Sequence, residues 1–133
     1  MTTRLIFDSH ALLKFFQRES GGGIVEKWLR TAQRLGWVKY LCAINLGEII
    51  YATKRQFGDQ RKIEVLAHIH RLDFMILPVP NELIYQAAEY KADYSISSAD
   101  CFVLACAIEQ AATIVTGDPE FKKVSHLAKI HWV

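Results

Sequence analysis

The stretch SSADCFVLACAIEQAATIVTGDPEF, residues 97–121, decides the fold of this chain. Two serines and Asp100 precede an apolar segment that predicts a buried helix. The β-branched residues 113–116 predict a short strand, and Gly117-Asp118-Pro119 predicts a turn after it. A helix that leads into a strand of a parallel sheet brings its own start and the end of that strand to the same edge. We therefore expect Asp100 and Asp118 to lie at one edge of a sheet.

The rest of the chain alternates apolar segments of strand length with segments of helical periodicity. We predict strands over residues 4–8, 38–44, 74–79, 113–116 and 130–133, with helices over 9–17, 24–35, 59–72 and 82–92, a helix beginning at Asn45, and the helix of the opening stretch. The run Glu19–Gly23 predicts a flexible loop. This alternation indicates an α/β domain with a mostly parallel sheet of about five strands.

Length and composition are those of a single globular domain. The chain has 133 residues, of which 51% are hydrophobic and 23% charged, with a formal net charge of +2. Three cysteines without metal-binding spacing indicate reduced thiols in a cytoplasmic protein. The longest apolar run, Cys101–Ile108, is far shorter than the roughly 20 residues of a membrane helix. The start of the chain lacks an apolar run long enough for a signal peptide.

Four acidic residues are predicted at the same edge of the sheet. Asp8 ends the first strand, Glu48 lies in the first turn of the helix after the second strand, Asp100 opens the helix before the fourth strand, and Asp118 follows that strand. In open α/β sheets, ligands bind outside the carboxyl ends of the strands. These four acids are therefore the candidate site.

Helix capping explains each of these acids individually. Asn45-x-x-Glu48 and Ser97-x-x-Asp100 have the spacing of capping boxes, and Asp118 precedes a proline suited to the first helical position. Asp8 is placed to cap the helix that starts at Ser9. Taken one at a time, none of the four requires a catalytic or metal-binding role.

Four carboxylates at one edge are harder to explain by stability alone. Two carboxylates about 4 Å apart repel by roughly 4 kcal/mol at an effective dielectric constant of 20. A divalent cation removes that repulsion, and oxygen ligands without a cysteine or histidine cluster favour Mg²⁺ or Mn²⁺. The chemistry suited to such a site is metal-assisted hydrolysis of a phosphodiester.

The same residues carry a family resemblance. The strings LIFDSHALL, INLGEIIYA, SSADCFVLACA and IVTGDPEF, in this order, resemble the PIN-domain ribonucleases, and among them the VapC toxins of bacterial and archaeal toxin–antitoxin pairs. The resemblance extends from Arg4 to Phe121. It implies one PIN domain over residues 1–133, built as a three-layer α/β/α sandwich.

The resemblance also implies an activity, a site and partners. The activity is that of an endoribonuclease that depends on Mg²⁺ or Mn²⁺ and inhibits translation by cutting RNA. The acidic quartet and metal ligands are Asp8, Glu48, Asp100 and Asp118, and the hydroxyl of Thr116 holds a neighbouring carboxylate or a water. The implied partners are an RNA substrate, a cognate antitoxin and a second copy of the chain.

Three other classes of protein are alternatives to this interpretation. Phosphatases of the haloacid dehalogenase type require D-x-D after the first strand, where this chain has Asp8-Ser9-His10. Receiver domains require an acidic pair there, and this chain has one acid. A PIN-like module that binds RNA or protein without cutting remains the alternative. Degraded acidic positions would favour that alternative, and the four positions are intact here.

Overall fold

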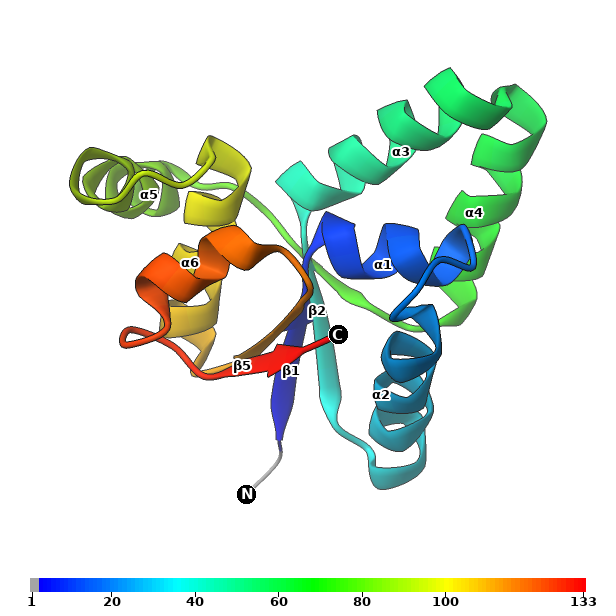
Figure 1. Ribbon diagram of the computed structural model, residues 1–133, viewed down its shortest axis with the longest axis horizontal. Helices are drawn as coiled ribbons and strands as arrows, with labels where there is room; N and C mark the ends of the chain where they lie inside the picture. Colours follow the sequence, from blue (N-terminus) through cyan, green and yellow to red (C-terminus); the bar gives the residue numbers. More distant parts are fainter. Residues whose placement is uncertain (1–2) are drawn as a thin grey trace.

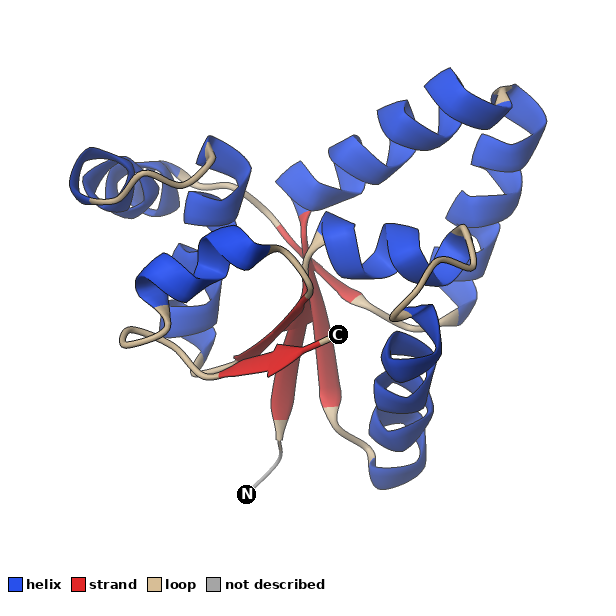
Figure 2. Ribbon diagram, in the orientation of Figure 1, coloured by secondary structure: helices blue, strands red, loops and turns tan. Residues whose placement is uncertain are grey.

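The computed structural model describes residues 3–133 and contains a parallel sheet of five strands within them (Figures 1 and 2). The strands are β1 (Arg4–Phe7), β2 (Val38–Cys42), β3 (Met75–Leu77), β4 (Thr113–Thr116) and β5 (Ile130–Trp132), and their order in the sheet is β3-β2-β1-β4-β5. All four pairings are parallel. The predicted α/β class and the parallel sheet are confirmed.

Helices cover both faces of the sheet, which gives the three layers that the family resemblance implied (Figure 1). They are α1 (Ser9–Phe16), α2 (Gly22–Leu35), α3 (Ala43–Phe57), α4 (Asp59–Arg71), α5 (Asn81–Asp93), α6 (Ser98–Gln110) and the short 3-10 helix η1 (Pro119–Val124). Side chains of a strand alternate between the two faces. In β1, Leu5 and Phe7 pack in the core with α1 and α2, while Ile6 packs in the core with α5 and α6.

Most of the predicted boundaries were wrong by one or two residues, and three of them show how. The strand predicted over residues 74–79 is only Met75–Leu77, because Pro78 and Pro80 have no N–H for the sheet ladder. Strand β2 ends at Cys42 rather than at residue 44, and helix α3 follows it directly, so α3 begins at Ala43 rather than at Asn45. Helix α5 begins at Asn81, one residue earlier than predicted.

The predicted glycine-rich loop is shorter than expected. Gly21 has a left-handed backbone (φ 93°) and precedes α2, whereas Gly22 and Gly23 are already helical. Gly22 allows α2 to start against the end of α1: a Cβ atom there would lie 2.6 Å from the carbonyl oxygen of Lys14. A Cβ atom on Gly23 would meet nothing within 4 Å.

These two neighbouring glycines give a matched prediction. Gly22→Ala is expected to destabilise the fold by about 1–3 kcal/mol, since α1 and α2 must separate to admit the methyl group. Gly23→Ala is expected to stabilise it by up to about 1 kcal/mol through helix propensity. Urea unfolding of both variants measures the difference. Equal stability of the two variants would show that the close contact between α1 and α2 is not required.

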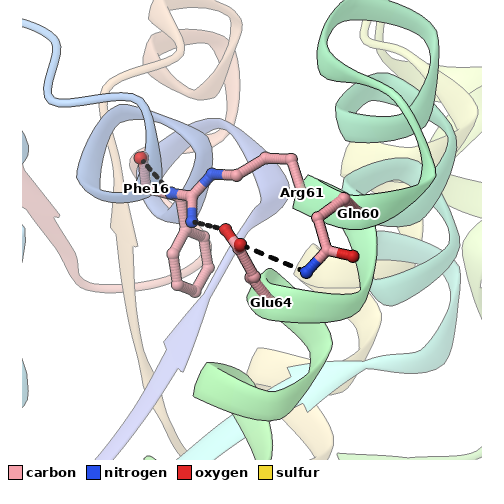
Figure 3. Close-up of polar contacts among 4 residues, drawn as sticks. All are labelled: Phe16, Gln60, Arg61 and Glu64. Atoms are coloured by element: carbon pink, nitrogen blue, oxygen red, sulfur yellow. Dashed lines mark hydrogen bonds and ion pairs between the residues drawn. The ribbon is translucent and has the colours of Figure 1, made fainter.

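An arginine ties the two helices α1 and α4 together (Figure 3). Arg61 Nη2 donates to the carbonyl oxygen of Phe16, the last residue of α1, at 2.9 Å, and Nη1 lies 3.3 Å from a Glu64 oxygen. A cation at a helix C-terminus interacts favourably with the helix dipole.

Among the helices of residues 3–133, none has the length and hydropathy needed to cross a membrane.

Candidate active site

The strand order places the candidate site at a topological switch point, beside which the chain connections run to opposite sides of the sheet. From β1 the chain proceeds to β2 and β3 on one side, and β4 and β5 lie on the other. Crevices at the carboxyl ends of such strands are ligand sites in open α/β sheets. Asp8 directly follows β1 and Asp118 follows β4 by two residues, so both acids lie beside this crevice.

Asp8 is held by hydrogen bonds on both carboxylate oxygens. Its side chain is 1% exposed. Oδ1 accepts from the amide of Ala11 at 2.8 Å, which confirms the predicted cap of α1, and Oδ2 accepts from the hydroxyl of Thr116. Thr116 Oγ1 in turn accepts from the amide of Asp118 at 3.0 Å. Thr116 therefore connects the acid after β1 to the turn after β4.

A second group of carboxyls is formed by Asp100, Asp118 and Glu120, whose nearest oxygens lie within 4.8 Å of one another. Ser97 Oγ accepts from the amide of Asp100 at 3.1 Å, so Ser97 caps α6 as predicted. The other half of that predicted capping box is wrong. The amide of Ser97 donates to Glu120 Oε2 at 3.0 Å, and this leaves the Asp100 carboxyl available to the site.

Sequence reasoning missed Glu120. It lies two residues after Asp118, within the string IVTGDPEF, and the 3-10 helix η1 turns it back toward the start of α6. Asp118 caps η1 through the amide of Glu120 at 3.0 Å, which confirms the predicted cap. The available signal was the presence of two acids at i and i+2 around a proline that begins a helix.

Glu48 is held from two directions. Ser9 Oγ donates to Glu48 Oε1 at 2.9 Å, and Asn45 Nδ2 donates to the same oxygen at 2.8 Å. The predicted capping box of Asn45 and Glu48 is wrong, because no side chain caps α3. Glu48 is outside the group of three carboxyls, yet its negative charge is near enough to raise the pKa of Asp8.

Burial and mutual repulsion perturb the titration of the site. Burial raises the pKa of Asp8 to about 7 against the hydrogen bonds from Thr116 and Ala11, and the charges of Asp118 and Glu48 raise it further. Burial, the adjacent Glu120 carboxyl and the charges of Asp118 and Asp8 raise the pKa of Asp100 to about 9. The contact with Asp100 lowers the pKa of Glu120. At neutral pH Asp100 therefore holds its proton and Asp8 is about half protonated, unless a cation binds.

The donor atoms fit a hard divalent cation. Asp100 Oδ2 is buried, and no N–H or O–H group of residues 3–133 donates to it. A buried carboxylate oxygen without a donor is costly unless a proton or a cation compensates it. The surrounding donors are carboxylate oxygens, which are the ligands preferred by Mg²⁺ and Mn²⁺ rather than by zinc.

The fold and the site define an α/β domain with a carboxylate centre at the switch point of a parallel sheet. The model of the PIN domain family matches residues 5–127, and the chain belongs to this family. Comparison with curated protein sequences gives no match.

Several solved structures share this fold. A chain of the VapBC2 complex of Rickettsia felis, bound to a DNA fragment from its promoter, superposes with a TM-score of 0.78 at 13% identity, covering 98% of this chain and 99% of that chain. The Mycobacterium tuberculosis toxin VapC20, described as cleaving the Sarcin-Ricin loop, gives 0.76 at 15% identity, covering 90% and 94%. FitAcB from Neisseria gonorrhoeae gives 0.71 at 18% identity, with 95% coverage of each.

Proposed function

We propose that this chain is a metal-dependent endoribonuclease and the toxin of a toxin–antitoxin pair, acting as one PIN domain. The observation that carries the proposal is the meeting of two buried acids, Asp8 and Asp100, with Asp118 at the switch point of the sheet. Holding such groups together without a cation requires them to keep protons. A site built only for stability would replace them with neutral caps.

In this proposal the cation is Mg²⁺ or Mn²⁺, held by Asp8, Asp100 and Asp118 with Glu48 and Glu120 as further ligands. A divalent cation activates water for attack and stabilises negative charge on phosphate oxygens. Thr116 keeps Asp8 in place through its hydroxyl, and Ser97 fixes the first turn of α6 that carries Asp100. A cation bound there would require both Asp8 and Asp100 to be ionised.

Lysines beside the site support an RNA substrate. Lys91 Nζ donates to the carbonyl oxygen of Ile96 at 2.7 Å, and Lys123 Nζ donates to that of Ser95 at 2.7 Å. Both ammonium groups are thereby held against the segment that leads into α6 and Asp100. An ammonium group has three donors, so each keeps capacity for a phosphate oxygen.

Two protein partners are proposed for this chain, an antitoxin and a second copy of the chain itself. A structure of similar fold from Klebsiella pneumoniae is a toxin–antitoxin complex, which supports an antitoxin as a partner of this chain. A homodimer is proposed as well. Exposed apolar side chains on the edge strand β3 and on α5, which follows it in the chain, are suited to such a contact: Met75, Ile76, Ile84 and Tyr85.

The test is direct cleavage. Purified protein, separated from any antitoxin, is expected to cut RNA internally in the presence of Mn²⁺, and EDTA is expected to stop the reaction. Mapping the new 5′ ends after brief expression in cells identifies the target. If the protein binds RNA without producing new ends under any of these conditions, the alternative of a non-catalytic binding module replaces this proposal.

A further inference from the structure

Asn45 occupies an unusual position in the structure. It lies in the first turn of α3 and is 1% exposed, although asparagine is a poor helix former and is rarely buried. It does not cap the helix, and its side-chain nitrogen donates to Glu48 Oε1 at 2.8 Å. Helix formation therefore does not explain an asparagine at this position.

The other half of the Asn45 carboxamide is left without a partner. Asn45 Oδ1 is buried, and no donor in the described part of the chain reaches it. Turning the carboxamide over would place this oxygen against the Glu48 carboxylate, where two acceptors repel each other. The orientation that bonds Glu48 thus leaves an oxygen unsatisfied, which is unfavourable for folding.

Ser9 makes the second contact with the same atom. Its hydroxyl donates to Glu48 Oε1 at 2.9 Å from the first residue of α1, so the two donors come from different helices. Neither donor engages Glu48 Oε2. Two bonds on one oxygen fix the rotation of a carboxylate and leave its second oxygen available for a ligand. The neighbouring acid is Asp8, which directly precedes Ser9 and feels the charge of Glu48.

We propose that Asn45 and Ser9 are positioning residues, which hold Glu48 so that its Oε2 serves the cation at the acidic site. The inference rests on the proposed metal-dependent function and adds to it the groups that orient one ligand. Groups that donate hydrogen bonds to a metal-ligating side chain restrict its motion, and their loss typically weakens metal binding ten- to a hundredfold.

The experiment measures the affinity of Mn²⁺ by isothermal titration calorimetry on the purified full chain. Asn45→Ala and Ser9→Ala are each expected to raise the Kd by roughly ten- to a hundredfold. Ser9→Thr keeps the hydroxyl and is expected to bind within about threefold of the original protein. Ser9 is only half-buried, so its variants remain informative if Asn45→Ala folds poorly.

The same substitutions made in a Glu48→Ala variant distinguish a positioning role from a general loss of structure. When Glu48→Ala is already present, adding Ser9→Ala is expected to change the Kd by less than about twofold, because the oriented group is gone. A merely structural role of Ser9 would weaken binding equally in both backgrounds. That result would overturn the inference, as would an unchanged Kd in both single variants.

Cleavage assays on the same proteins separate this inference from the proposed function. If the unmutated chain binds Mn²⁺ and the variants bind more weakly, but no RNA is cut, the positioning role stands and the nuclease proposal fails. If the unmutated chain cuts RNA and the variants keep its Mn²⁺ affinity, the nuclease proposal stands and the positioning role fails.

Discussion

Replacing Asp100 or Asp8 by asparagine is expected to lower Mn²⁺-dependent RNA cleavage by at least about a thousandfold, a loss of roughly 4 kcal/mol of transition-state stabilisation. Asparagine has nearly the same shape but lacks the negative charge that a hard cation requires. Both acids are buried in the site, and Asp100 Oδ2 has no protein donor among the described residues to compete with a cation. Expression of either variant is expected to leave growth unaffected.

The control for this experiment is Glu109→Gln. Glu109 is on the same helix as Asp100 but is exposed near its C-terminal end, so its cleavage rate is expected to remain within about twofold. Near-ultraviolet circular dichroism checks that every variant keeps its tertiary packing. A cleavage rate for Asp100→Asn close to that of the original protein would remove the acid from the chemistry.

The sequence was sufficient for the sheet and for the location of its acids because both depend on local patterns. Apolar segments of strand length alternate with helical periodicity, and Asp8 and Asp118 follow two of those segments within two residues. The caps made by Asp8, Ser97 and Asp118 were predictable for the same reason, since a cap depends on residues within one turn.

The contacts that complete the candidate site were not predictable in this way. Glu120 meets Asp100 only because η1 turns back toward α6, and the bond between Glu120 and the Ser97 amide spans 23 residues. Asn45 has the spacing of a cap, but β2 ends earlier than expected, so Asn45 falls inside α3 and its side chain bonds Glu48 instead. An error of two residues in the predicted end of β2 is therefore the difference between Asn45 as a helix cap and Asn45 as a hydrogen-bond donor to Glu48.

Without metal, the stability of the protein is expected to fall as pH rises, through Asp8 and Asp100. Their pKa values in the fold, about 7 and about 9, exceed the ordinary aspartate value of 3.8. The unfolded chain releases these protons at lower pH than the folded chain does. At pH values between the ordinary pKa of 3.8 and these raised pKa values, the unfolded state binds fewer protons than the folded state. The free energy of unfolding therefore decreases as the pH rises.

Asp100→Asn isolates this effect, because asparagine does not titrate. The variant is expected to gain stability relative to the original protein between about pH 5 and pH 9, by up to about 1.4 kcal/mol per pH unit. Urea unfolding at several pH values, without metal, measures this difference, and titrating histidines and cysteines cancel between the two proteins. A difference that stays constant across the range would show that Asp100 has an ordinary pKa.

Adding saturating Mg²⁺ is expected to reverse the order of the two proteins at the alkaline end of this range. A cation that binds only the folded state stabilises it by mass action, and it does so best when Asp8 and Asp100 are ionised. The original protein therefore gains stability with Mg²⁺, and Asp100→Asn gains little because one carboxylate is missing. An equal gain in both proteins would place the bound Mg²⁺ away from Asp100. The same carboxylates that weaken the metal-free fold are thus the groups through which a cation strengthens it.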